Sequence, residues 1–232
     1  MIPMTATEGS TKTRKGEQTR GRILECALAM FRERGYDATT MRAIANEAGV
    51  SLGNTYYYFA SKDHLIHAYY ARSHQDHLAA CDPLLESETD LKNRLIGVLA
   101  AKIETSQPYH HFAGQLFKTA ADPKSPLSPF SHESAPVRLE SIELLTRVVE
   151  GSSTKVTGKL AQELPELLWT YQMGIILYWI HDDSRDCART YRLIEQTGDL
   201  VVRLVRVSRL PPMRPLVSRA LKLVAELRAP LP

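Results

Sequence analysis

The sequence predicts an all-α protein in which a small N-terminal domain of three helices precedes a larger helical body. Apolar residues recur at the three- and four-residue spacing of helices in most segments of the chain. Capping residues and glycines mark the ends of the N-terminal helices. The length of 232 residues allows one large domain or two small ones, and a hydrophobic content of 44% is enough to form a core.

The first helix is predicted over residues 18–34. Its apolar face consists of Ile23, Leu24, Ala27, Leu28 and Phe31, and Gly35 follows its end. Residues 1–16 form a short, polar stretch without a helix cap, so we expect them to be disordered. The first folded element therefore starts after this stretch.

A second, short helix is predicted after Thr39 and Thr40, whose hydroxyls can accept from the free amides of a first turn. Its apolar face carries Met41, Ile44, Ala45 and Ala48. Gly49 can take the left-handed conformation that ends a helix, and Ser51 can cap the next one. Two helices joined by so tight a turn must cross steeply. This is the arrangement of a helix-turn-helix, whose second helix lies in the major groove of duplex DNA.

The second helix of this pair has residues that suit a groove better than a core. Gly53 allows close approach to another backbone or a base edge, and Asn54 can offer the donor and acceptor that adenine requires. The tyrosines at 56–58 fan around the helix, so at most two can point inward and the others keep hydroxyls free for phosphates. Lys62 stands at the start of the following helix, where an ammonium and free amides favour a phosphate. The alternative is that these tyrosines only pack within the protein and do not contact nucleic acid.

The stretch Thr39–Leu65 resembles the DNA-binding region of the TetR family of transcriptional regulators. The matching positions are Thr39, Thr40, Ile44, Ala45, Ala48, Gly49, Val50, Ser51, Gly53, Tyr56, Tyr57, Phe59, Lys62 and Leu65, preceded by Ile23, Ala27, Phe31, Gly35 and Tyr36. The resemblance implies that the residues contacting DNA, mostly its backbone, are Thr40, Ser51, Gly53, Asn54, Tyr56, Tyr57 and Lys62. We add Arg42 and Leu52 to this predicted DNA-binding set. Leu52 stands where a Lys is common and Tyr58 where a His is common, which leaves the base preference unreadable.

The charge distribution supports contact with DNA at one end of the chain. Up to Lys62 the basic residues exceed the acidic ones by three, which equals the net charge of +3 of the whole chain. Residues 203–228 are basic as well, and residues 63–202 carry a net charge of −6. A basic arm could also reach the minor groove or flanking phosphates, although a solubilising tail explains its first three members equally well; it comprises Lys12, Arg14, Lys15, Arg20 and Arg22.

Composition also predicts where the protein works. No apolar run approaches the ~18 residues that span a bilayer, and the N-terminus is polar, so we expect no membrane contact. The three cysteines are odd in number and widely spaced, which argues against disulfides and for the reducing cytoplasm. Cys26 lies beside the apolar face of the first helix, where a small core hydrophobe is expected.

The next helix is predicted over residues 61–80, with Leu65, Ile66, Tyr69 and Tyr70 turned inward. By the resemblance, it is the lever that transmits ligand binding. Four histidines share one arc of this helix and could in principle hold a divalent ion: His64, His67, His74 and His77. No Cys or carboxylate completes the shell, and a polar helix face explains the same pattern. We therefore predict no metal and no cofactor.

The rest of the chain reads as further helices. A break is expected at Asp82 and Pro83, followed by helices over 90–106, 109–121 and 136–150. Residues 122–135, rich in Pro and Ser, are expected to lack regular structure and to form a lid or mobile segment. A polar stretch over 151–163 precedes Pro165, which suits the first turn of a helix ending near His181. Helices over 184–207 and 216–228 follow, and the last has no assigned role.

Two of these C-terminal helices predict a homodimer. The segment ending near His181 is apolar almost all round, and in one chain little can bury Ile176, Tyr178 and Trp179. The next helix adds a second set of apolar residues: Leu193, Ile194, Leu200, Val201, Leu204 and Val205. A second copy would cover both sets in a four-helix bundle, as the family resemblance also implies.

A small-molecule effector is expected to bind among the central helices. The predicted lining residues, each of which could equally be plain core, are Tyr70, His74, Phe112, Gln115, Phe117, Trp169, Tyr171, Met173 and Tyr178. Many aromatic groups and few charges favour an apolar or aromatic ligand.

The sequence thus predicts a ligand-responsive repressor that binds a palindromic operator as a dimer. Its domains are a disordered basic arm (1–16), a helix-turn-helix domain (17–60) and a helical ligand-binding and dimerisation domain (61–232). A helical protein-binding adaptor or a metal-dependent helical enzyme with a vestigial helix-turn-helix are the alternatives. No local nucleophile and base, phosphate loop or zinc-protease spacing is present, so we predict that the protein is not an enzyme.

Overall fold

The computed structural model describes residues 8–228, and the side chains of all of these except 8–13, 111, 115, 214, 224, 225, 227 and 228. Described residues form helices and turns without any strand, which confirms the all-α prediction. They divide into two compact units. Of the described residues, unit 1 comprises 8–72 and Tyr109–Ser134, and unit 2 comprises Ser73–Pro108 and 135–228. None of the described helices is long and apolar enough to cross a membrane.

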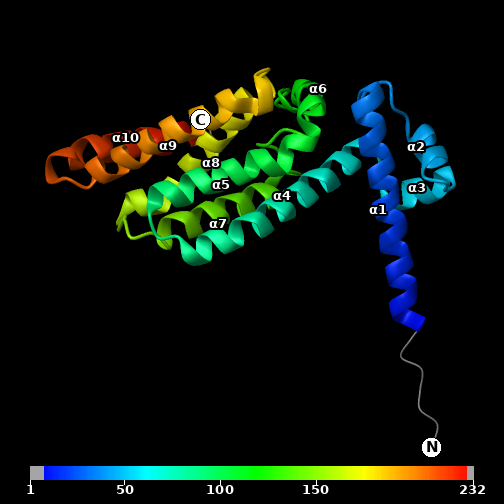
Figure 1. Cartoon of the computed structure of the whole chain (residues 1–232), viewed down its shortest axis with the longest axis horizontal. Helices are drawn as coiled ribbons and strands as arrows, with labels where there is room; N and C mark the ends of the chain where they lie inside the picture. The colour runs from blue at the N-terminus through cyan, green and yellow to red at the C-terminus, as the bar shows by residue number, and fades with distance from the viewer. Residues whose placement is uncertain (1–7, 229–232) are drawn as a thin grey trace, which may run out of the picture. The chain divides into compact units, whose positions relative to one another are not determined.

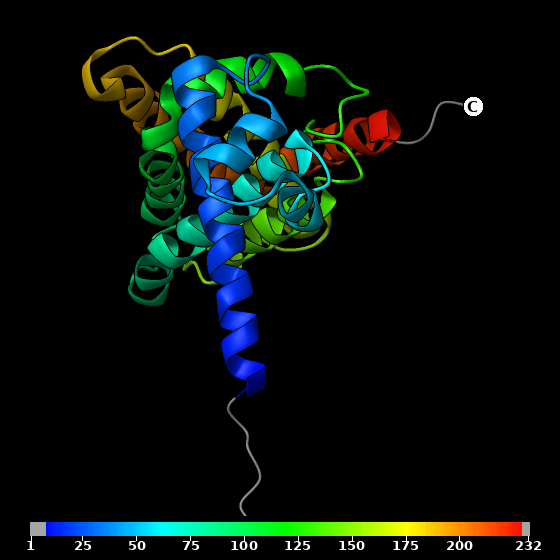
Figure 2. The ribbon, with the colours of Figure 1, turned by 90° about the vertical axis from the view of Figure 1, so that its right-hand side faces the viewer.

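Unit 1 contains α1 (Glu8–Arg34), α2 (Met41–Glu47), α3 (Leu52–Tyr58), the first part of α4 (Lys62–Ser87) and α6 (His110–Ala120). Figures 1 and 2 show the short helices α2 and α3 beside the long α1. The predicted inner faces of α1 and α2 are confirmed, because their apolar residues are buried, all but Ala45 in one cluster together with Phe59, Leu65 and Phe112. The helix-turn-helix is therefore built on a continuous apolar core.

The caps predicted at Thr40 and Ser51 are confirmed, whereas the cap predicted at Thr39 is wrong, because its buried hydroxyl donates to the Gly35 carbonyl at 2.8 Å. The Thr40 hydroxyl accepts from the Ala43 amide at 3.2 Å, and the Ser51 hydroxyl accepts from the Asn54 amide at 3.1 Å. Gly49 has a φ of +64°, the left-handed conformation that a turn between two helices requires. These local features fix how α3 follows α2.

The start of α1 differs from the expectation. The helix begins at Glu8, upstream of Gln18, so residues 8–16 are helical where disorder was expected. Helix propagation explains this difference, since extending a helix that the core already anchors costs far less than nucleating one. The expected disorder of residues 1–7 lies outside the described residues.

The Pro- and Ser-rich segment of unit 1 is folded as consecutive turns. The amides of Ser125, Ser128 and Ser131 donate to carbonyls three residues earlier, at 2.9–3.1 Å. The hydroxyls of the same residues accept from amides two or three residues later, at 3.1–3.3 Å. Leu127 is fully buried in the core of unit 1. As expected, the segment forms no regular helix, but its own hydroxyls order it.

Unit 2 contains the rest of α4, α5 (Leu91–Ser106), α7 (Ala135–Glu150), α8 (Lys159–Ile180), α9 (Ala188–Ser208) and α10 (Arg214–Arg228). Short 3₁₀ turns occur at Gln107–Tyr109, Arg185–Cys187 and Pro211–Met213. Helices α5, α7, α8 and α9 pack side by side, and α10 packs on α8 (Figure 1). The sequence predicted this succession of helices.

Two predicted helix boundaries at prolines are wrong. Helix α4 continues through Pro83 to Ser87, and α8 begins at Lys159, so Pro165 lies inside it and not in its first turn. A proline inside a helix removes a hydrogen bond and costs roughly 3 kcal/mol. Packing offsets that cost here, because Cys81 and Leu85 beside Pro83 and the helix residues around Pro165 are buried.

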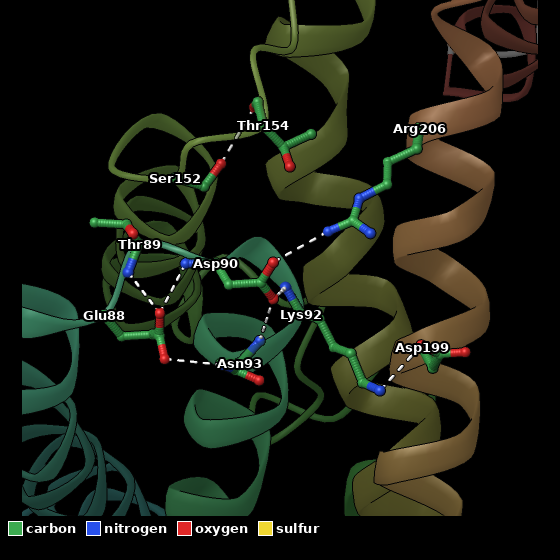
Figure 3. Close-up of polar contacts among 9 residues, drawn as sticks. All are labelled: Glu88, Thr89, Asp90, Lys92, Asn93, Ser152, Thr154, Asp199 and Arg206. Atoms are coloured by element: carbon green, nitrogen blue, oxygen red, sulfur yellow. Dashed lines mark hydrogen bonds and ion pairs between the residues drawn. The ribbon is translucent and has the colours of Figure 1, made fainter.

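Polar contacts hold the ends of the helices of unit 2 together (Figure 3). The Asp90 carboxylate caps α5 by accepting from the Lys92 and Asn93 amides, and it also pairs with Arg206 of α9 at 3.1 Å. Lys92 pairs with Asp199 of α9 at 3.0 Å. These contacts fix α9 along α5.

Candidate nucleic-acid interface

Helix α3 has one buried and one open face. Thr55 is fully buried, and its hydroxyl donates to the Ser51 carbonyl at 3.2 Å. Gly53 and Asn54 are exposed, Tyr56 is 48% exposed and Tyr57 is 82% exposed. Such exposure is unusual for large aromatic side chains in a monomer, and it marks a surface available to a partner.

No contact within the chain requires the glycine at position 53 on this open face. A Cβ atom at Gly53 would meet no other atom within 4 Å. Glycine costs about 1 kcal/mol relative to alanine inside a helix, and no packing of the chain requires it at this position. A close approach from outside the chain would require it.

The three consecutive tyrosines divide as predicted. Tyr58 is half-buried and packs against the core cluster of unit 1, whereas Tyr56 and Tyr57 remain exposed. The Tyr57 and Tyr58 rings meet edge to face with centroids 5.1 Å apart. Two phenol hydroxyls thus remain on the open face, where they can donate to phosphate oxygens.

Lys62 is already engaged within the protein. Its ammonium donates to the Tyr36 carbonyl at 2.6 Å and lies 4.2 Å above the Tyr36 ring. The Tyr36 hydroxyl in turn donates to the Asp63 carboxylate, and burial together with that acceptor raises the Tyr36 pKa. An ammonium has three donors, so Lys62 can still bind a phosphate while these contacts fix its position. The sequence did not point to Tyr36 and Asp63 in this role.

The other predicted DNA-binding residues lie at or near the same two helices. Arg42 on α2 is exposed and forms no ion pair with any described residue. Thr40 and Ser51 are exposed at the helix starts that they cap. Leu52 is half-buried against the core cluster, so part of its surface remains for a partner. The described cations of the arm are exposed on α1: Arg14, Lys15, Arg20 and Arg22. The side chain of Lys12 lies outside the described residues.

The predicted effector-binding residues are divided between the two units. In unit 1, Phe112 is buried and stacks on Phe31 with centroids 5.6 Å apart, as a core residue does, while Tyr70 and Phe117 are half-buried. Burial raises the Tyr70 pKa. The side chain of Gln115 lies outside the described residues.

In unit 2, Trp169 is buried, Met173 is half-buried and Tyr178 is 42% exposed. The Tyr171 hydroxyl hydrogen-bonds to Thr197 and thereby links α8 to α9. None of the predicted effector-binding residues lines the two described cavities of unit 2.

The four histidines of α4 fall into the two units, two in each. His74 and His77 of unit 2 are buried, and His77 Nε2 lies 2.9 Å from the Val98 carbonyl. His74 Nε2 lies 3.3 Å from a Glu140 carboxylate oxygen, but not in hydrogen-bonding geometry. Burial and the nearby Lys102 ammonium lower the pKa of both. Among the described residues, no three His, Cys, Asp or Glu side chains gather as metal ligands would.

The tight turn, the paired caps and the open face of α3 define a helix-turn-helix protein. Residues 23–69 match the family model of the bacterial regulatory proteins of the tetR family, and residues 94–223 match that of the tetracyclin repressor-like C-terminal domain. The second match alone covers more than half of the chain. The chain therefore belongs to the TetR family.

Curated relatives match over part of the chain. The chain is 39% identical over 92 residues to the HTH-type transcriptional repressor KstR2 of Mycobacterium tuberculosis, which is 39% of this chain and 46% of that repressor. It is 45% identical over 56 residues to the repressor KstR of Rhodococcus jostii, 24% of this chain and 26% of the relative. The matches thus span less than half of either relative.

Solved structures match over most of the chain. A putative TetR-family regulator from Syntrophomonas wolfei has a TM-score of 0.64 at 17% identity, covering 80% of this chain and 95% of that structure. The fatty acid degradation regulator FadR from Bacillus halodurans has a TM-score of 0.61 at 16% identity, covering 78% and 94%. At these identities the likeness establishes the fold alone.

Proposed function

We propose that the protein is a cytoplasmic transcriptional repressor that binds a palindromic operator as a homodimer and leaves it when a small molecule binds. The open face of α3 is the observation that carries this proposal. This face of the helix-turn-helix exposes Gly53, which no contact within the chain requires, together with the Asn54 amide and the phenols of Tyr56 and Tyr57. Residues 23–69, which contain α3, match the model of the tetR-family regulatory proteins. KstR2 and KstR, which match part of the chain, are transcriptional repressors.

The residues of the interface have different proposed roles. Asn54 reads a base edge, since its amide can pair with adenine in the major groove. Tyr57, Lys62 and Arg42 bind phosphates, which fixes the register of the helix without reading sequence. Gly53 lets the backbone of α3 approach the groove.

Footprinting of the DNA next to the protein's own gene, with and without cell extract, tests the function directly. We expect the protein to protect a palindrome and to leave it when extract is added.

Fluorescence anisotropy on that site then separates the roles of the interface residues. Tyr57→Phe and Lys62→Ala should weaken binding to all sequences alike, and Lys62→Ala should also lower the salt dependence, whereas Asn54→Ala should relax preference at one position. Equal behaviour of the three variants would contradict the assigned roles.

A homodimer is proposed because α8 and α9 leave apolar side chains open. Leu200 and Leu204 on one face of α9 are 55% and 60% exposed, and Leu177 and Tyr178 on α8 are exposed as well. Gly174, one turn before Tyr178, is exposed and a Cβ there would meet nothing within 4 Å. A second copy packing these helices closely would bury the apolar surface.

The proposed effector is an apolar or aromatic molecule bound by some of the aromatic residues predicted above. In unit 2 we propose Trp169 as the main contact, because it is a buried aromatic side chain. A thermal-shift screen of a compound library tests this choice, because a ligand that binds only the folded state raises the melting temperature. Apolar aromatic hits that also release DNA would support it. A preference for strongly charged metabolites that release DNA would contradict it.

A further inference from the structure

A cavity lies in unit 2 where the loop before α8, the end of α9 and α10 come together. Its volume is about 420 Å³, which is in the range of small-molecule sites. The helices that form its walls lie next to one another in Figure 1. The predicted effector-binding residues lie elsewhere, so this cavity is a separate site.

The mouth of the cavity is positively charged. Lys155, Lys159 and Arg209 are exposed lining residues, and none of the described residues that line it is acidic. These three cations form no ion pair with a described residue, whereas Arg206, one turn before Arg209, pairs with Asp90 (Figure 3). Three uncompensated cations around one concave surface favour an anionic group there, because a recessed wall focuses their field.

The deeper part of the cavity is apolar. Leu221 of α10 is 5% exposed, and Val156, Leu160 and Val217 are half-buried beside it. The side chains of Ser208 and Ser218 add hydroxyls to the lining. An apolar floor below a cationic mouth fits a molecule with an apolar chain and one anionic group.

We propose that this cavity binds a small amphipathic carboxylate, whose chain lies on the floor and whose carboxylate pairs with Lys155, Lys159 and Arg209. A second copy of the chain fits the cavity poorly, because a symmetric contact would bring the same cations together. The site gives α10 a role, since α10 supplies Val217, Ser218 and Leu221. This inference does not depend on DNA binding, so each can fail without the other.

Calorimetric titration of the full-length protein with decanoate tests the proposal. Decanol and decyltrimethylammonium, which keep the chain and change the head group, are the matched ligands, and all three are used below their aggregation concentrations. Decanoate should bind more tightly than either, and salt should weaken its binding. Lipid vesicles containing anionic phospholipid serve as the membrane arm, and the proposal expects no binding to them.

Two variants locate the site. Lys159→Glu with Arg209→Glu should weaken decanoate binding about tenfold, as expected for reversing two exposed cations. The control pair, Arg185→Glu with Arg192→Glu, makes the same change in charge on exposed positions of unit 2 away from the cavity and should bind like the unaltered protein. Val217→Trp should fill the cavity and weaken binding without a change in charge.

The proposal is overturned by equal binding of decanoate and decanol, by equal losses in the cavity and control pairs, or by binding that survives Val217→Trp in a protein whose melting temperature is unchanged. Binding of vesicles in place of free decanoate would overturn it as well. Tighter decanoate binding that only the cavity variants weaken would support it.

Discussion

Gly53 makes its own helix less stable than an alanine at the same position would. The helix would gain from a methyl group at this position, and the surrounding structure leaves room for one. The same methyl group would lie on the face that we propose approaches DNA. Stability and binding should therefore respond to this residue in opposite directions.

We predict that Gly53→Ala raises the free energy of unfolding by up to about 1 kcal/mol and weakens operator binding at least about tenfold. Urea denaturation and fluorescence anisotropy measure the two effects on one preparation. Unaltered operator affinity in the stabilised variant would show that nothing approaches α3 at this point.

His77 is a residue whose burial makes stability depend on pH. Burial, assisted by the Lys102 and His74 charges, lowers its pKa to about 3. At pH values below the ordinary histidine pKa of about 6.5, His77 is protonated in the unfolded chain but stays neutral in the folded chain. Stability is thus complete above that value and falls with decreasing pH, down to the folded pKa.

We predict that His77→Gln, which keeps a donor for the Val98 carbonyl, flattens the loss of stability between about pH 6.5 and 4. The slope removed should approach 1.4 kcal/mol per pH unit. Urea midpoints across this range measure it, with the exposed His132→Gln or His181→Gln as the control. An unchanged slope would mean that other groups, such as His74, dominate.

At the scale of elements, Arg94 joins the ends of three helices. It lies on the inner face of α5 with only 3% of its surface exposed. Its guanidinium donates to the carbonyls of Leu85 and Glu88 at the end of α4 and to those of Arg147 and Val148 at the end of α7. The Arg147 carbonyl also accepts from the Gly151 amide at 3.1 Å. The last carbonyls of a helix lack amide partners within it, so the guanidinium supplies donors to these two helix ends, and their partial negative charge stabilises the cation.

We predict that Arg94→Met destabilises the protein by about 2–4 kcal/mol, because the carbonyls at both helix ends lose the hydrogen bonds that the guanidinium donates. Arg94→Lys should recover only part of this loss, since one ammonium cannot reach both helix ends. Arg189→Gln, which breaks the exposed pair with Asp183, should cost less than about 1 kcal/mol. A similar cost for Arg94→Met and Arg189→Gln in urea denaturation would contradict the capping role.

At the scale of the whole molecule, the proposed dimer makes a quantitative prediction. Leu204→Lys places a charge in the middle of the exposed apolar face of α9 and should convert the protein to a monomer with an unchanged helix content. Operator affinity should fall at least about a hundredfold, because one helix-turn-helix would then bind alone. Light scattering and anisotropy measure both, and Leu139→Lys, at an exposed position of α7, serves as the control. A monomeric unaltered protein would refute the dimer.

The sequence predicted most of the helices and the open face of α3, because caps, the Gly49 turn and apolar spacing are local signals. The predictions were wrong at Pro83 and Pro165. A sequence rule assumes that a proline ends a helix, but the burial of neighbouring residues outweighs the local cost of the proline here. The predictions also missed Arg94 and the cavity beside α10. Arg94 interrupts an apolar face and looks like an exposed residue until the helix ends around it are known, and the cavity joins segments that are far apart in sequence.

The serine turns of unit 1 have a consequence for proteolysis. Proteases bind their substrates as extended strands, and Lys124 is exposed in a segment whose composition suggests an easy target. The hydrogen bonds of Ser125, Ser128 and Ser131 hold that segment in turns and so oppose the extended form. Trypsin should cut slowly after Lys124 in the native protein and faster in Ser128→Ala with Ser131→Ala, which gives a direct readout of how firmly these hydroxyls hold the chain.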